Sequence, residues 1–208
     1  MTALPKTDEY ISEEEYFALL EKSEINLDWI DGRVYPRHNP YGLLPEAMAG
    51  ASDAHIDIAA EFFTELNIAL RGKPCSVVSE NQKVKADHSY VYPDITIYCG
   101  EREKDERGNL TNPVVIIEVL SPGTQVYDKN AKWEKMREIE TLRDYLLVSQ
   151  ERVLVEHRHK RDANHWDLTY LNRLDDEIVL DSIQVRLRVA AVYARVRFDA
   201  ENTESTPE

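Results

Sequence analysis

The sequence contains little cysteine and no long apolar segment. Only two cysteines, Cys75 and Cys99, occur among its 208 residues. So few cysteines predict no disulfide framework and favour a reducing cytoplasm. No apolar run approaches the ~20 residues that span a bilayer. The first ten residues also lack the charged-then-apolar pattern of a signal peptide. We therefore expect a cytoplasmic protein with no membrane partner.

Positive charge is also scarce. The chain has 25 Lys and Arg residues against 39 Asp and Glu residues, which gives a formal net charge of -14. Nonspecific binding to duplex DNA relies on an excess of Lys and Arg, so this balance counts against a nucleic-acid partner unless a local basic patch exists. Apolar residues make up 42% of the chain, enough for one sizeable core and therefore one domain.

The N-terminal third contains clear signals for two helices and a hairpin. Residues 1–11 are expected to form a flexible arm. Ser12 and Glu15 form a capping-box pattern that predicts a helix to about Lys22. In NLDWIDGRVYP, the pair Asp31-Gly32 predicts a tight hairpin turn. A proline-rich loop covers residues 37–47, and a long helix is expected from Ser52 to a stop at Gly72.

The remainder reads as strands with a second helix between them. Asp128 is expected to cap a helix over residues 130–142. The last apolar stretch, residues 187–196, predicts a terminal helix, and residues 199–208 an acidic disordered tail. The expected strands lie at residues 75–79, 83–86, 90–99, 113–120, 144–150, 151–159, 165–172 and 177–180. This order predicts a single α/β domain over residues 12–198, with helices on the faces of a mixed sheet.

Two acidic residues lie at unusual places in apolar, strand-like surroundings. Asp94 follows Pro93 inside YVYPDITIYC, and Glu118 ends the run VVIIE. If their strands are neighbours, the two carboxylates converge and offer the oxygen ligands that Mg²⁺ or Mn²⁺ prefers. The alternative is that each acid caps a strand end or pairs with a nearby Lys or Arg.

The order of these motifs resembles a known family. Pro-Asp on one strand, followed 24 residues later by a Glu that ends another, is similar to the PD-(D/E)xK phosphodiesterase pattern. More specifically, residues from about Glu13 to Val196 resemble the Uma2 family of proposed endonucleases. The matching segments are DWIDGRVY, MAGASDAH, YPDITIYC, IIEVLSPGTQVYDKNAKWE and LRDYLLVSQ.

The resemblance implies a fold, a reaction and two metal ligands. It implies a restriction-endonuclease-like mixed β-sheet flanked by helices, with an N-terminal helix and hairpin and extra C-terminal strands. By the same resemblance, Asp94 and Glu118 are catalytic residues that bind Mg²⁺ or Mn²⁺, the substrate is DNA, and the protein is a homodimer.

The broader superfamily has a lysine two residues after the second acid, where this chain has Leu120. A leucine cannot stabilise the charge of the transition state, so Lys132 on the following helix is the expected catalytic substitute. Its alternative role is an i,i+4 partner of Asp128 on a solvated face. If Lys132 is not the substitute, Lys83 and Lys85 are the next candidates.

Two further residues are secondary candidates. His55 begins the long helix and resembles a recurrent histidine of the family, although a polar residue there is also satisfied by local backbone. Asp128 precedes Lys132 by one turn. We expect the hairpin around Gly32 to lie outside the site, because its match to the family reflects turn chemistry.

Two functions follow from these observations. The first is a Mg²⁺- or Mn²⁺-dependent endonuclease that hydrolyses phosphodiester bonds of DNA. The alternative is a noncatalytic nuclease-fold module used for binding or assembly, which the acidity of the chain and Leu120 favour. A metal-independent hydrolase has no support, because no Ser-His pair lies in a recognisable nucleophile motif.

Overall fold

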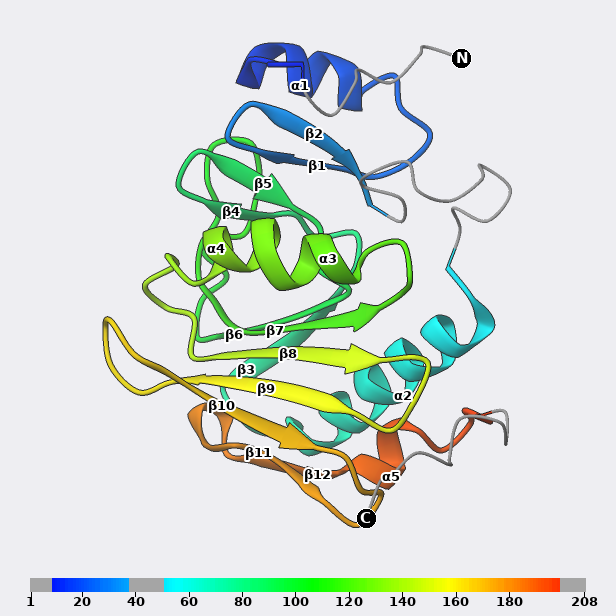
Figure 1. The fold of residues 1–208 in the computed structure, drawn as a ribbon. Helices are drawn as coiled ribbons and strands as arrows, with labels where there is room; N and C mark the ends of the chain where they lie inside the picture. Colours follow the sequence, from blue (N-terminus) through cyan, green and yellow to red (C-terminus); the bar gives the residue numbers. More distant parts are fainter. Residues whose placement is uncertain (1–8, 38–50, 199–208) are drawn as a thin grey trace.

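A six-stranded mixed sheet lies at the centre of the protein (Figure 1). The computed structural model describes residues 9–37 and 51–198. The strand order is β10-β9-β8-β7-β6-β3. Strands β7 and β8 are parallel and all other neighbours are antiparallel, as the prediction of a mixed sheet requires. The strands are β3 (Cys75–Ser79), β6 (Ile95–Cys99), β7 (Pro113–Leu120), β8 (Asp144–Ser149), β9 (Val155–Lys160) and β10 (Trp166–Leu171).

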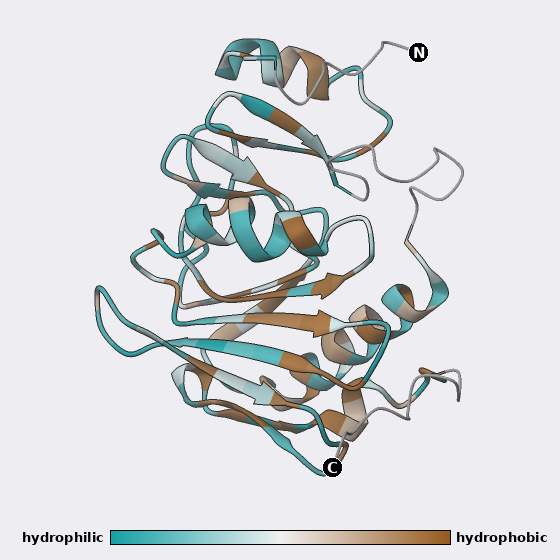
Figure 2. Ribbon diagram, in the orientation of Figure 1, coloured by the Kyte–Doolittle hydropathy of each residue, from teal (hydrophilic) through white to brown (hydrophobic). Residues whose placement is uncertain are grey.

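Strand β7 is buried on both faces of the sheet. Its side chains alternate, so Val115, Ile117 and Val119 pack into one apolar core, whereas Ile116 and Leu120 pack into a second core on the opposite face. Both β7 and β8 are largely hydrophobic in Figure 2. Glu118 shares the face of Ile116 and Leu120, and is therefore an acid placed within an apolar row.

Helix α2 (Asp53–Ala69) covers the first of these faces, together with the C-terminal elements (Figure 1). Its N-cap is Ser52, as predicted, and Gly72 adopts a positive φ just beyond its end. The C-terminal elements are β11 (Glu177–Leu180), a 3-10 turn (Asp181–Ile183), β12 (Val185–Arg188) and α5 (Val189–Val192).

The predicted terminal helix over residues 187–196 is therefore largely wrong. Leu187 and Arg188 belong to β12 and pair with β11, and only Val189–Val192 is helical. Tertiary pairing with the preceding strand decides the conformation here, because a short apolar segment fits either structure.

A helical segment in three parts lies over the opposite face of the sheet (Figure 1). It consists of α3 (Gln125–Tyr127), a π-helical turn (Asp128–Lys132) and α4 (Trp133–Met136). The prediction that Asp128 caps this helix is wrong, because the Asp128 amide already donates to the Thr124 carbonyl at 2.9 Å. Asp128 thus lies inside the helix, not at its start.

The N-terminal elements form a separate layer at the end of the molecule (Figure 1). Helix α1 (Glu13–Leu20) has the predicted capping box between Ser12 and Glu15. The predicted hairpin is β1 (Leu27–Ile30) and β2 (Arg33–Pro36), and a four-stranded sheet is completed by β5 (Ser89–Val91) and β4 (Val84–Ala86).

The hairpin turn needs glycine for two reasons. Gly32 has φ +81°, and a Cβ atom built on it would lie 2.2 Å from the ring of Tyr10. The amide of Ile11, the last residue of the expected arm, donates to the Gly32 carbonyl at 2.7 Å. The rest of that arm up to residue 8, most of the proline-rich loop and the expected tail at 199–208 lie outside the described residues.

Cys75 and Cys99 form a disulfide, whereas the low cysteine content predicted no disulfide framework. They stand directly opposite each other on the antiparallel strands β3 and β6. Their sequence separation of 24 hides this pairing in the sequence. In the described ranges 9–37 and 51–198, the helices are too short or too polar to cross a membrane.

Candidate active site

Asp94 lies at the junction between β5 and β6. The sequence predicted one strand over residues 90–99, but the ladder stops at Val91 and resumes at Ile95, because Pro93 has no amide hydrogen to donate. The Asp94 carboxylate therefore lies at a strand end, where its Oδ2 accepts a hydrogen bond from the Val119 amide at 2.6 Å. This contact ties Asp94 to the central strand β7.

Glu118 lies next to Asp94 and is buried, with 2% of its surface exposed. Its Oε2 accepts a hydrogen bond from the Asp94 amide at 3.3 Å. Because β6 and β7 are neighbours, the two acids meet at the same end of the sheet, as their positions in the sequence predicted. Leu120 shares the face of Glu118, as expected from its i+2 position.

Lys132 approaches Glu118 from the π-helical turn above the sheet. Its Nζ lies 2.8 Å from Glu118 Oε1 and 3.6 Å from the nearer Asp128 oxygen. At this distance the ammonium makes a charge-assisted contact with Glu118 Oε1. Lys132 is only 2% exposed, so the alternative of a solvated helix face is wrong.

The hairpin contributes to this cluster, which the sequence did not predict. Asp28 of β1 is fully buried, and its carboxylate lies 3.7 Å from Lys132 Nζ. It also accepts hydrogen bonds from the Tyr92 amide at 2.7 Å and the Tyr127 hydroxyl at 2.8 Å. Our expectation that the hairpin lies outside the site is therefore wrong for Asp28.

Two basic side chains cover Asp94 on its other side. Arg37, just after β2, pairs with Asp94 Oδ1 and with Glu80 at 2.8 Å, and is buried. His55 in the first turn of α2 places Nε2 3.2 Å from the same Asp94 oxygen. His55 is thus at the site, as the sequence suggested, whereas Arg37 went unnoticed because it adjoins an irregular loop.

The side chains of the cluster surround a cavity of about 10 Å³, which is close to the space that one water molecule needs. The lining residues are Arg37, His55, Asp94, Glu118, Thr124, Asp128 and Lys132. Thr124 was not predicted, since nothing in its sequence context distinguishes it from a helix-start threonine.

The carboxylates of the cluster differ in the direction in which their pKa values are shifted. Burial raises the pKa of Glu118 well above its usual range, against the opposing effect of Lys132. Burial also raises the pKa of Asp128 to about 6. Burial acts on Asp94 in the same sense, but the basic neighbours, His55 first, outweigh it and lower the pKa of Asp94. Asp94 is therefore held ionised, whereas burial opposes ionisation of Glu118 and the Lys132 ammonium favours it.

The two other lysine candidates lie in the N-terminal layer. Lys83 Nζ lies 4.4 Å from the ring centroid of Phe17, and burial lowers its pKa to about 8. Lys85 Nζ lies 3.8 Å from Asp105. Neither lysine lines the cavity, so the structure does not bring them together with Asp94 and Glu118.

A second set of possible metal ligands lies on the opposite face of the sheet. Asp144 Oδ1 is 2.7 Å from both His157 Nε2 and His159 Nδ1, and its Oδ2 accepts a hydrogen bond from Ser182. Every carboxylate oxygen here already has a donor. The first cluster brings two carboxylates, Asp94 and Glu118, to one cavity, which makes it the better site for a hard cation.

Comparison with known proteins identifies the family. The model of the Uma2 family, described as "Putative restriction endonuclease", matches residues 13–191. The chain belongs to the Uma2 family. The uncharacterized protein slr1290 of Synechocystis sp. is 29% identical over 190 residues, which cover 90% of this chain and 94% of that protein. A second uncharacterized Synechocystis protein, sll1609, is 26% identical over 86% of this chain and 97% of its own length.

A solved structure shares the fold of this Uma2 chain. It is described as a putative nuclease belonging to DUF820 from Anabaena variabilis. The two superpose with a TM-score of 0.66 at 17% identity, covering 88% of this chain and 98% of the other. The expected fold, a restriction-endonuclease-like mixed sheet flanked by helices with an N-terminal helix and hairpin and extra C-terminal strands, is confirmed.

Proposed function

We propose that this protein is a Mg²⁺- or Mn²⁺-dependent endonuclease that hydrolyses phosphodiester bonds of DNA. The observation that supports this most strongly is the cluster of Asp94, Glu118 and Lys132 at one end of the central sheet. Here two acids from neighbouring strands share a cavity with a buried lysine, and such gatherings of titratable groups with shifted pKa values are typical of functional sites.

The donors present fit a hard divalent cation. Asp94 and Glu118 supply carboxylate oxygens at one cavity, the type of ligand that such an ion prefers. Positive charge there would also oppose the effect of burial, which favours neutral Glu118. A bound ion would supply a water of lowered pKa and neutralise charge on the scissile phosphate.

Lys132 can perform the role that Leu120 cannot. Its ammonium lies 2.8 Å from Glu118 Oε1, and the surrounding carboxylates, Glu118 first, raise its pKa against the effect of burial. The lysine therefore stays protonated and can place positive charge beside a phosphate oxygen in the transition state. Arg37 can bind a second phosphate oxygen, since its planar guanidinium suits such pairing.

The test is cleavage of a supercoiled plasmid and of a labelled single-stranded oligonucleotide, with Mg²⁺, Mn²⁺ or EDTA. We expect the wild type to cleave only with metal, and Asp94→Asn and Glu118→Gln to lose activity by roughly a hundredfold or more. The matched control is Glu138→Gln, which replaces an exposed residue on the segment after α4 and should cleave normally. Binding of Mn²⁺ alone, followed by calorimetry, should weaken in Asp94→Asn.

Lys132 needs a different control, because its removal leaves buried carboxylates unpaired. Loss of one partner of a buried ion pair costs roughly 3–5 kcal/mol. Lys132→Met is therefore compared with Glu118→Gln/Lys132→Met, which should recover much of the lost stability while remaining inactive. A folded wild type that binds Mn²⁺ but cleaves neither substrate would contradict the proposal and favour the noncatalytic binding module.

A further inference from the structure

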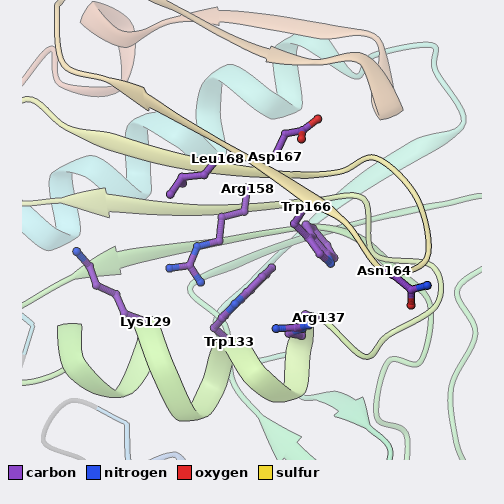
Figure 3. Close-up of a pocket in the computed structure, with 8 residues that line it drawn as sticks. All are labelled: Lys129, Trp133, Arg137, Arg158, Asn164, Trp166, Asp167 and Leu168. Atoms are coloured by element: carbon purple, nitrogen blue, oxygen red, sulfur yellow. The ribbon is translucent and has the colours of Figure 1, made fainter.

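A larger pocket, drawn in Figure 3, lies on the same face of the sheet as Glu118. Its volume is about 410 Å³, and it is formed between the helical segment and strands β9 and β10. The side chains that matter are Lys129, Trp133 and Arg137 from the helical side, with Arg158, Trp166 and Leu168 from the strands. In a chain of net charge -14, three cations around one pocket are unusual.

Aromatic surface runs through this pocket and beyond it. The rings of Trp133 and Trp166 meet edge to face, with centroids 4.9 Å apart. Leu168 and Tyr170 follow Trp166 at i+2 and i+4 on β10, so the three side chains share one face of the strand. Leu168 is 48% exposed and Tyr170 is 58% exposed. An exposed aromatic stripe of this kind marks a binding surface.

Arg158 has hydrogen-bonding capacity that the described residues do not use. Its guanidinium lies 4.5 Å from the ring centroid of Trp133, and Nη2 is 3.8 Å from Glu156. Its Nη1 is buried and has no acceptor among the described residues. A buried guanidinium nitrogen without an acceptor is costly, and an anionic oxygen in the pocket would satisfy it.

The other charges around the pocket are paired in different ways. Lys129 is bonded to Glu156, and Arg137 is 3.5 Å from Glu134 on an exposed helix face. Asp167 also lines the pocket, but it is 3.3 Å from Arg161, and its carboxylate points away from the two tryptophans in Figure 3. The pocket therefore keeps a cationic character close to its rings.

The pocket and the candidate active site are neighbours along the sheet. Glu118 on β7 is paired with Leu147, which is paired with Glu156 on β9, so all three side chains share one face. Two strand spacings separate β7 from β9 by ~10 Å. The pocket residues Arg158, two positions further along β9, and Trp166 on the adjacent strand β10 lie beyond Glu156 on this face.

We propose that this pocket binds a single-stranded segment of nucleic acid, with one base stacked on Trp166 and its phosphate held by Arg158 and Arg137. Stacking requires an exposed base face, which an intact duplex does not offer. Single-strand binding through aromatic side chains also needs less positive charge than duplex binding. The proposal rests on the proposed function in one respect only, namely that the bound nucleic acid continues toward Glu118.

The test measures fluorescence anisotropy of a fluorescein-labelled oligothymidylate of about 12 nucleotides in EDTA, where metal-dependent cleavage does not occur. A blunt duplex of equal length is the comparison. We expect the wild type to bind the single strand more tightly. Trp166→Ala and Arg158→Gln should each weaken binding roughly fivefold or more. Quenching of tryptophan fluorescence by the bound strand is expected in the wild type only. Arg186→Gln, an exposed arginine of β12, is the charge-matched control and should bind normally.

Trp166 and Arg158 are partly buried, so their substitution can impair folding. Arg137→Gln/Tyr170→Ala changes only well-exposed side chains and should also weaken single-strand binding. The proposal is overturned if the wild type does not bind the single strand, or if this double variant binds like Arg186→Gln. It is also overturned if the double variant changes only the oligomeric state in light scattering, since the surface would then contact a second copy.

The result of this binding test can be distinguished from the result of the cleavage test of the proposed function. Wild-type cleavage with unchanged KM in the pocket variants would remove the binding proposal and leave the endonuclease intact. Loss of single-strand binding in those variants, in a wild type that cleaves nothing, would support the pocket and remove the endonuclease.

Discussion

Asp144 at the start of β8 is a fully buried charge that two histidines and a serine satisfy. Its Oδ1 lies 2.7 Å from nitrogens of His157 and His159, and Ser182 donates to its Oδ2. A buried carboxylate is tolerated when all of its oxygens accept hydrogen bonds. The residues that satisfy Asp144 come from β9 and from the turn before β12, so this carboxylate links the sheet to the C-terminal elements.

We expect Asp144→Asn to remove an acid-sensitive part of the stability. Burial favours a higher pKa for Asp144, but hydrogen bonds from His157, Ser182 and His159 outweigh it and lower the pKa. A carboxyl with a lowered folded-state pKa contributes stability that is present above about pH 4 and is lost as pH falls through the folded-state value. In urea unfolding, the variant should therefore be less stable than the wild type at pH 7, by a difference that shrinks on acidification. A difference independent of pH would contradict this, and exposed Asp87→Asn is the control.

Among the single residues of the candidate site, the sequence predicted the acids better than their partners. Asp94 and Glu118 stood out because a charge inside an apolar strand is rare. Arg37 and Asp28 did not, since Arg37 adjoins an irregular loop and Asp28 lies in a short hairpin strand whose match to the family was attributed to its turn. Only the packing of the N-terminal layer onto the helical segment reveals them, and this packing joins residues about 100 positions apart, such as Asp28 and Tyr127.

Among the elements, the helical segment over residues 125–136 differs most from its prediction. The sequence indicated a regular helix capped by Asp128, whereas the structure has a π-helical turn at Asp128–Lys132. A π turn has more residues per turn than an α-helix and often occurs at functional sites. Here the π turn contains both Lys132, which faces Glu118, and Asp128, which belongs to the same cluster. Local propensity does not contain this information, because burial of the lysine against carboxylates from other elements decides the geometry.

The disulfide between β3 and β6 gives a prediction for these two strands. It joins the edge strand β3 to the sheet and closes a loop with a sequence separation of 24 residues. Loop-closure entropy gives such a link ~3 kcal/mol of stability, or roughly 6–12 °C in Tm. Adding a reductant should lower the Tm of the wild type by about this amount and leave Cys75→Ala/Cys99→Ala unchanged. Two reactive thiols in denatured protein purified without reductant would contradict the pairing.

The charge of the whole molecule bears on how it meets a polyanion. With 39 acidic against 25 basic residues, most of the surface repels phosphate. The cations that remain near the candidate site are few and are placed beside aromatic rings. This distribution favours a substrate recognised at a few positions through stacking, and it disfavours the broad electrostatic contact through which duplex-binding proteins hold the backbone.

The dependence of single-strand binding on salt distinguishes these two modes. If only Arg137 and Arg158 contact phosphates, the logarithm of the binding constant should fall with the logarithm of the salt concentration with a slope of about -1.4, since each contact on a single strand contributes about -0.7. Arg137→Gln should make the slope shallower by about 0.7, because one contact is lost. Anisotropy titrations over a series of NaCl concentrations measure both values. A slope near -6 would require phosphate contacts spread over much of the surface, which the charge of -14 does not support.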